Sequence, residues 1–284
     1  MKNNIQNIEK ILKSGKGTVA LLAPSFVSVF NYPDIVIALR ELGFEKVVEL
    51  TFGAKMVNSE YHKILNKNQF FISTVCPGIT EFIKTNYPQL KDNLIQVDSP
   101  MTAMAKICKK NYPKLKTVFI SPCNFKKTEA ESSKYVDYVI DYQQLKILLQ
   151  KNKISLKHKD CGKFGEFDAF YNDYTKIYPL AGGLSKTAHL KGVLTKDEVK
   201  VIDGVSAVKK YLDGYVKNPD KKIKFLDINF CVGGCIGGPF TDQNVSVAKK
   251  KKRILKYLNL AKKEKIPEKN KGWIKKADGI KFGK

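Results

Sequence analysis

Short apolar segments rich in β-branched residues alternate with amphipathic segments along most of this 284-residue chain. The apolar segments are predicted as buried strands, and the segments between them show helical periodicity. Strands that alternate with helices favour parallel sheets whose faces are covered by helices, an α/β architecture. The expected strands are Thr18–Leu22, Lys46–Leu50, Phe70–Thr74, Thr117–Ser121, Tyr138–Ile140 and Ile223–Phe230, and the expected helices are Tyr32–Leu42, Glu60–Asn66, Met101–Lys109, Tyr142–Asn152, Val205–Tyr211 and Val245–Glu264.

Four of the six cysteines lie at the ends of these expected strands or close to them. Cys76, Cys123 and Cys231 each come at or just after the end of a strand, and Cys235 lies four residues beyond Cys231. Because ligands in open α/β sheets gather at the carboxyl ends of strands, we expect these thiols to converge. Four thiolates are the ligand set of a cubane iron–sulfur cluster. The spacing is not the compact Cys-x2-Cys-x2-Cys run of a ferredoxin, so the folded domain must bring the ligands together.

Apolar residues make up 43% of the chain, an ordinary share for a globular protein of one large or two small domains. No apolar run approaches the roughly 20 residues of a membrane span. The first ten residues lack the apolar core of a signal peptide. We therefore expect a cytoplasmic protein with no membrane partner. Six cysteines are too few for a disulfide-stapled scaffold of this size.

The three cysteine loops resemble, in this order, the signature loops of the H-cluster domain of iron-only ([FeFe]) hydrogenases. That family has Thr-Ser-Cys-Cys-Pro, Pro-Cys-x-x-Lys-x-x-Glu and Cys-x-x-x-Cys followed by glycines. This chain has Ser-Thr-Val-Cys-Pro at 73–77, Ser-Pro-Cys-Asn-Phe-Lys-Lys-Thr-Glu at 121–129 and Cys-Val-Gly-Gly-Cys-Ile-Gly-Gly at 231–238. Residues 22–26, 51–54, 98–101 and 178–188 also look like that domain. Ser-Pro-Cys in place of Met-Pro-Cys, with the segment 178–188, looks most like the sensory or slow-turnover branch.

The resemblance implies an α/β fold with two lobes of mostly parallel sheet, flanked by helices, and a metal cofactor in the cleft between them. It implies a single H-cluster domain over residues 1–284, with interleaved lobes. In the family, a [4Fe-4S] cubane is bridged through one cysteine to a two-iron subsite that carries carbon monoxide, cyanide and an azadithiolate. By position, Cys235 would be the bridging ligand, and Cys76, Cys123 and Cys231 would be the terminal ligands.

The resemblance also assigns residues around the two-iron subsite. Lys126, three residues after Cys123, matches a lysine at a cyanide ligand, and Glu129 would neutralise or orient it. Ser25 matches a family position that bonds the other cyanide. Glycine allows positive φ and close approach of the backbone to the cofactor. The expected catalytic residues are Cys235, Lys126 and Ser25, and the expected cofactor-binding residues are Ser25, Lys126, Glu129, Pro24, Pro122, Gly233, Gly234 and Met101.

The implied activity is reversible oxidation of H2 to protons and electrons, with an acidic electron carrier such as ferredoxin as partner. The two-iron subsite would come from dedicated maturation proteins. An anaerobic source follows from the oxygen sensitivity of such a site. Protein from an ordinary expression host should therefore be inactive and contain at most the cubane.

Several positions depart from the fast enzymes of the family. Val75 stands where these have the cysteine that hands protons to the bridgehead amine, and loss of such a group typically slows a reaction by ~10²–10⁴. Ser121 stands in place of methionine, and Met101 in place of glutamine. Glu60 lies near the family's acidic proton path, whose other members have no match here. We therefore expect slow turnover or hydrogen sensing.

A second class of function stays open, a non-catalytic iron–sulfur protein of the same fold that holds only a [4Fe-4S] cluster. Retention of Cys235, Lys126 and Ser25 favours the hydrogenase, because these residues serve the two-iron subsite. No accessory Cys-x2-Cys-x2-Cys segment is present. The chain is therefore either a minimal form or a fragment of a longer protein.

The net charge of +24, from 51 basic and 27 acidic residues, permits three interpretations. The first is a lysine-rich solvated surface with no specific role. The second is a docking face for an acidic electron carrier, because opposite fields raise encounter rates. The third is nucleic-acid binding through the basic run at 248–253, which no recognised nucleic-acid module accompanies. We disfavour the third for that reason.

Three further residues have simpler interpretations. Cys108 lies in an expected helix and is predicted to be a core thiol. Cys161 lies in a polar stretch, where we expect it to be exposed. Tyr178 is expected to pack in the wall between the lobes.

Overall fold

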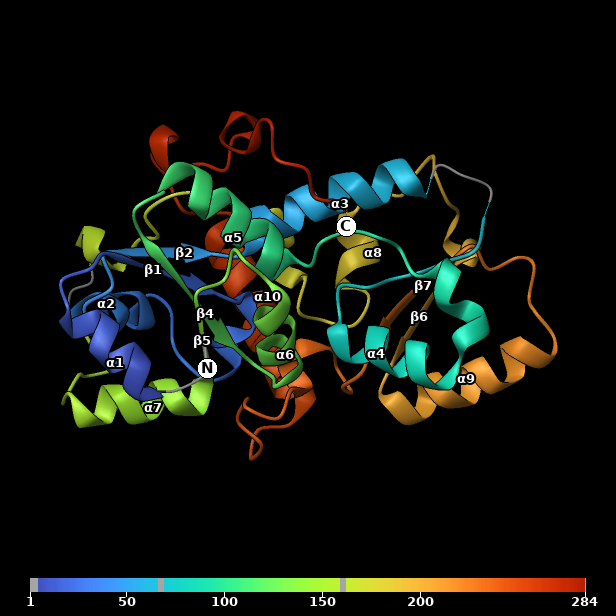
Figure 1. Cartoon of the computed structure of the whole chain (residues 1–284), viewed down its shortest axis with the longest axis horizontal. Coiled ribbons are helices and arrows are strands. Elements are labelled where there is room, and N and C mark those ends of the chain that lie inside the picture. The colour runs from blue at the N-terminus through green and yellow to red at the C-terminus, as the bar shows by residue number, and fades with distance from the viewer. Residues whose placement is uncertain (1–4, 66–68, 159–161, 284) are drawn as a thin grey trace.

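The computed structural model describes residues 5–65, 69–158 and 162–283. Within these ranges the chain forms two separate parallel sheets, one of four strands and one of three. Figure 1 shows the larger sheet in one half of the molecule and β6 and β7 of the smaller sheet in the other half. The α/β class with two parallel-sheet lobes, predicted from the sequence, is therefore confirmed.

The larger sheet has the strand order β2-β1-β4-β5, and every neighbouring pair is parallel. Successive side chains of a strand point to opposite faces, so each face gathers its own core. Ala20 and Leu22 pack with helices α1, α2 and α7, whereas Val19 and Leu21 pack with α3 and α5. The bounds of these elements are β1 Thr18–Leu22, β2 Lys46–Glu49, β4 Lys116–Ser121, β5 Tyr138–Asp141, α1 Ile5–Lys13, α2 Asp34–Glu41, α3 Thr51–Ile64, α5 Pro100–Asn111 and α7 Tyr142–Lys151.

The smaller sheet has the order β3-β7-β6, again with parallel neighbours. Leu226 and Ile228 of β7 face helices α4 and α9, with Ile83 and Val208 among their partners. Phe225 points the other way and joins the core of the first lobe. The bounds are β3 Phe71–Ile72, β6 Val199–Asp203, β7 Phe225–Asn229, α4 Pro77–Asn86 and α9 Val205–Lys217.

The remaining helices lie between or beside the two sheets. They are α6 Phe125–Ser132, α8 Gly183–Thr187 and α10 Val247–Ala261, and Figure 1 shows α6 and α10 near the middle of the molecule. Side-chain caps fix two helix starts in the first lobe. Ser99 accepts a hydrogen bond from Thr102 N at the start of α5, and Asp141 and Gln144 form a capping box at the start of α7. No helix in the described part of the chain is both long and apolar enough to cross a membrane.

Element positions agree with the sequence prediction where burial produces a clear pattern. β1 has the predicted bounds, and β2, β4, β5 and β7 differ from theirs by a few residues. The helix expected from Glu60 starts instead at Thr51, because eight of its first eleven residues are buried and its start has no clear polar face. Asn66, its expected end, lies outside the described residues. β6 was missed because its residues are partly or fully exposed, so it has no apolar run.

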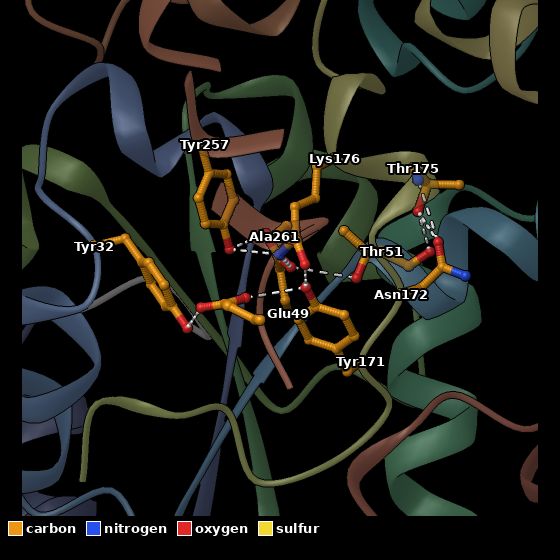
Figure 2. Close-up of polar contacts among 10 residues, drawn as sticks. Tyr32, Glu49, Thr51, Tyr171, Asn172, Thr175, Lys176, Tyr257 and Ala261 are labelled. Carbon is orange, nitrogen blue, oxygen red and sulfur yellow. Dashed lines mark hydrogen bonds and ion pairs between the residues drawn. The ribbon is translucent and has the colours of Figure 1, made fainter. Parts of the chain in front are cut away.

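A fully buried ion pair joins the end of β2 to the rest of the first lobe (Figure 2). Lys176 Nζ lies 2.7 Å from Glu49 Oε2 and donates to Tyr257 Oη at 2.7 Å, and Tyr257 Oη donates to Glu49 Oε1 at 2.9 Å. The side chains of Lys176 and Glu49 are 0% and 2% exposed. Burial raises the pKa of Glu49, while the Lys176 ammonium opposes that rise. The triad therefore connects a strand, a 3-10 turn and α10 that are far apart in sequence.

We predict that Lys176→Met lowers the free energy of unfolding by about 3–5 kcal/mol, because it leaves the Glu49 carboxyl buried without its cation. Urea unfolding of the cofactor-free protein measures the difference. Lys209→Met is the matched control, because Lys209 pairs with Asp213 on the surface, where ion pairs contribute little. Equal effects of the two substitutions would show that the buried pair does not hold these elements together.

Candidate metallocofactor site

The three cysteine loops leave the carboxyl ends of strands from both sheets. Cys76 follows β3 and caps α4, Cys123 follows β4, and Cys231 follows β7. Cys235 begins a short 3-10 turn, Cys235–Gly237. The four thiols interact electrostatically in every pairing. The structure therefore gathers the four predicted ligands in one region between the lobes.

Burial and the neighbouring thiols make Cys123, Cys231 and Cys235 poor acids in the cofactor-free protein, because they raise the pKa of each thiol. Burial, followed by the charges of Cys76 and Cys123, raises the pKa of Cys231 to about 11. Burial raises the pKa of Cys235 and of Cys123 as well, and the ammonium of Lys126 lowers both. Because metals bind thiolates, cluster insertion must displace protons from this site.

The glycine loop fixes the position of Cys235. Gly233 and Gly234 have φ of +84° and +78°, in the region that favours glycine. A Cβ on Gly234 would lie 2.6 Å from the carbonyl oxygen of Pro179. Cys235 N donates to the same carbonyl at 2.8 Å. The space that these glycines leave is thus filled by the protein itself, which holds Cys235 against Pro179.

A cavity lies between the lobes beside three of the thiols. It holds about 90 Å³ of free space, where about 10–15 Å³ suffices for one water molecule. Cys231, Glu129, Gly233 and Gly234 lie outside its lining. The predicted residues that line the cavity are Pro24, Ser25, Cys76, Met101, Pro122, Cys123, Lys126 and Cys235, and the other lining residues are Ala23, Leu50, Ala54, Val75, Pro77, Pro100, Phe119, Tyr178, Pro179 and Asn229.

Lys126 presents a nearly buried ammonium at the cavity wall. Its Nζ lies 2.6 Å from Glu129 Oε2 and donates to the carbonyl oxygen of Val75 at 3.3 Å. Glu129 therefore forms an ion pair with Lys126 that orients the ammonium. A cation held in an apolar cavity favours an anionic occupant.

The hydroxyl of Ser25 is hydrogen-bonded to a residue that the sequence analysis did not connect with the site. Its Oγ lies 2.6 Å from Tyr142 Oη, and both side chains are buried. Tyr142 Oη also donates to the carbonyl of Ala23 at 3.3 Å. Tyr142 is the first residue of α7, where a tyrosine ordinarily indicates only packing, so no local signal identifies this pair.

Val75 and Ser121, which depart from the fast enzymes, and Glu60, which was matched to the region of the proton path, have different places in the structure. Val75 lies on the cavity wall beside Cys76 and Lys126. Ser121 instead holds the Cys123 loop, because its Oγ accepts from Cys123 N at 3.1 Å and donates to Cys123 O at 2.8 Å. Glu60 pairs with Lys63 and is not among the residues that line the cavity.

Four thiols are the donor set that a cubane takes, with one thiolate at each iron. Among the described residues, no three His, Cys, Asp or Glu side chains lie close enough together to hold a single metal ion. Cys108 is fully buried in the first-lobe core, as predicted, and Cys161 lies outside the described residues.

Tyr178 does more than pack in the wall between the lobes. Its ring lines the cavity, and its hydroxyl is buried with no hydrogen-bond partner among the described residues. Burial, followed by nearby Tyr61, Asp227 and Cys235, raises the pKa of Tyr178 well above its ordinary value. The hydroxyl is therefore neutral and unsatisfied in the cofactor-free protein.

The fold and the site define a class, a two-lobed α/β metalloprotein whose three loops gather four thiols beside an apolar cavity. A family model described as "Iron only hydrogenase large subunit, C-terminal domain" matches residues 16–239. The chain belongs to this family of iron-only hydrogenase large subunits.

Two relatives and one solved structure are similar to most of this chain. Iron hydrogenase 1 of Clostridium pasteurianum is 26% identical over 255 residues, which cover 72% of this chain and 44% of that protein. The periplasmic [Fe] hydrogenase large subunit of Nitratidesulfovibrio vulgaris is 23% identical, over 82% of this chain and 71% of that protein. A solved variant of the [FeFe]-hydrogenase HydA1 from Chlamydomonas reinhardtii has a TM-score of 0.67 at 17% identity, over 95% of this chain and 90% of that one. The chain spans less than half the length of the Clostridium relative.

Replacing Tyr178 by Phe removes a hydroxyl that has no partner, so we predict that the free energy of unfolding of the cofactor-free protein stays the same or rises. Tyr142→Phe is the comparison, because it leaves the Ser25 hydroxyl without its partner and should lower this free energy by about 1–2 kcal/mol. Urea unfolding measures both. A loss for Tyr178→Phe as large as that for Tyr142→Phe would mean that the Tyr178 hydroxyl is satisfied in the folded protein.

Proposed function

We propose that this chain is the H-cluster domain of a hydrogenase that interconverts H2 with protons and electrons. One observation carries the proposal: four thiols from three loops meet beside an apolar cavity whose wall carries the Lys126 ammonium. When bound, a [4Fe-4S] cubane joined to a two-iron subsite with carbon monoxide, cyanide and azadithiolate ligands would supply the site at which hydrogen is split or formed. We further propose that residues 1–284 form one domain, because β3 of the second lobe lies in sequence between β2 and β4 of the first.

The residues of this chain would hold and orient that group. Cys76, Cys123 and Cys231 are the proposed terminal ligands, and Cys235, which lines the cavity, is the proposed bridge. Lys126 would donate to one cyanide, and its charge would balance the negative cofactor. Ser25, which Tyr142 fixes, would bond the other cyanide through its hydroxyl or its backbone.

Slow turnover or hydrogen sensing is the form of this activity that we propose. Val75 lies on the cavity wall, where its side chain has no proton to give. Its carbonyl oxygen accepts from Lys126, so the local backbone is already engaged with the ammonium. Loss of a positioned proton donor typically slows a reaction by ~10²–10⁴. The cavity therefore keeps the residues for cofactor binding and lacks the side chain for fast proton delivery.

The proposed partners follow from charge and from the nature of the cofactor. An acidic electron carrier such as ferredoxin would be attracted by the net charge of +24. Maturation proteins would deliver the two-iron subsite, in an anaerobic cell. The proposed compartment is the cytoplasm, although one relative is named as a periplasmic enzyme.

We predict that the protein, reconstituted anaerobically with iron and sulfide, takes up a synthetic two-iron cofactor. Infrared spectra should then show sharp cyanide and carbon monoxide bands that differ from those of the free cofactor and shift under hydrogen. Cys235→Ala should abolish these bands, whereas Cys108→Ala, the control at a buried thiol of the core, should keep them. A verified cubane that never binds the two-iron group would support the non-catalytic iron–sulfur protein instead.

Val75→Cys should raise the turnover of the fully loaded protein, by up to ~10²–10⁴ if proton delivery limits the rate. Hydrogen evolution, normalised to the infrared intensity of the bound cofactor, is the measurement. Val75→Ala is the control, because it opens similar space without a proton-carrying group. No gain for the cysteine variant over the alanine variant would show that another step limits turnover.

A further inference from the structure

The wall of the cavity offers few hydrogen-bond donors to an occupant. Five of the lining residues are prolines, which have no backbone N–H: Pro24, Pro77, Pro100, Pro122 and Pro179. Most of the other lining side chains are aliphatic, aromatic or thiol groups. Among the described lining residues, only Lys126 and Asn229 carry side-chain N–H donors. Any acceptor on a bound group therefore depends on a small number of side chains.

Asn229 reaches the cavity from the second lobe because of its register in β7. Leu226 and Ile228 face α4 and α9, and the alternation of the strand turns Phe225 and Asn229 toward the first lobe. Phe225 enters the core of that lobe, and Asn229, four residues on, lines the cavity. Lys126 comes from α6 in the first lobe. The two N–H donors thus stand on walls that belong to different lobes.

The side-chain amide of Asn229 contributes no hydrogen bond to the fold in the described part of the chain. Its backbone carbonyl accepts from Gly204 N at 3.1 Å, but its side chain makes no hydrogen bond to any described residue. Two other polar groups of the cavity differ in this respect, because Ser25 is bonded to Tyr142 and Lys126 is bonded to Glu129. The hydroxyl of Tyr178 also has no partner among the described residues, but it is fully buried, whereas Asn229 is half-buried. An occupant of the cavity that covers this half-buried side chain and excludes water from it would therefore have to supply the amide with a partner.

We propose that Asn229 is a cofactor-contacting residue whose amide Nδ2 donates a hydrogen bond to an acceptor of the bound metallocofactor. The acceptor is a terminal ligand of the two-iron group or a sulfide of the cubane. The bond is neutral, so it tunes the electron density of the cofactor without adding charge, whereas Lys126 contributes charge. This inference rests on the proposed function, and it adds to that function a second donor from the second lobe.

Asn229→Leu tests the proposal, because leucine has a similar size and no donor. In protein loaded with the synthetic two-iron cofactor, the carbon monoxide bands should move to lower frequency, since the irons keep electron density that the donor otherwise withdraws. If the acceptor is a sulfide, the midpoint potential of the cubane-only protein should fall instead, because hydrogen bonds to sulfur stabilise the reduced cluster. Loss of one neutral hydrogen bond should also speed release of the bound group roughly fivefold. Asn229→Asp cannot donate and adds negative charge. It should lower the carbon monoxide band frequencies, or the midpoint potential, further than Asn229→Leu does, and it should weaken cofactor binding further.

The thermal stability of the cofactor-free protein distinguishes a role of Asn229 in cofactor binding from a role in holding the fold. Asn229→Leu should leave the Tm of the cofactor-free protein unchanged, because the amide has no partner to lose. Asn58→Leu is the matched control: the Asn58 amide donates to Thr187 at 2.9 Å and does not line the cavity, so this variant should lower Tm and leave the bands and the potential unchanged.

The outcomes also separate this inference from the proposed function. If the wild-type protein loads and Asn229→Leu changes neither bands nor potential, the inference is wrong and the function stands. If the protein binds only the cubane, the function fails and the potential still decides the inference. If it binds neither group, both are wrong.

Discussion

Both sheets of this protein are parallel, and the carboxyl ends of β3, β4 and β7 lead into the three cysteine loops. Every other feature of the site depends on this geometric constraint, because loops at the same ends of parallel strands can meet without crossing the core. The four thiols lie up to 159 residues apart in sequence, from Cys76 to Cys235. The site therefore exists only in the folded protein, and the packing of the lobes determines the positions of the sulfurs.

A buried polar cluster in the first lobe also helps to position one wall of the cavity. Glu49 ends β2, and the next residue, Leu50, lines the cavity. The buried pair of Glu49 with Lys176 anchors this segment to α10 through Tyr257. Buried ion pairs contribute less to stability than their distances suggest, because both charges lose their hydration. The atoms of such a pair must nevertheless lie at hydrogen-bonding distance, so the pair fixes the position of Glu49 and of Leu50 beside it.

The sequence analysis predicted the fold class, most strands and the four cysteines, because burial and motif spacing leave strong local patterns. It could not find β6, whose exposed residues have no apolar run. It also gave no role to Tyr142 or Asn229, because the position of each relative to the cavity depends on residues far away in sequence. Tyr142 lies 117 residues from Ser25, and Asn229 reaches the cavity only because β7 turns that side chain toward the other lobe. Contacts of this kind are properties of the tertiary structure.

The five prolines of the cavity wall have a consequence for how such a site changes over time. Prolines restrict the backbone and supply no N–H groups, so the parts of the wall that they form are rigid and offer no hydrogen-bond donor. Its hydrogen bonding to a bound group therefore resides in a few side chains that project from otherwise stable elements. Substitutions that tune the reactivity of a bound group are therefore expected at these few side chains, whereas substitutions of the prolines are expected to disturb the scaffold itself.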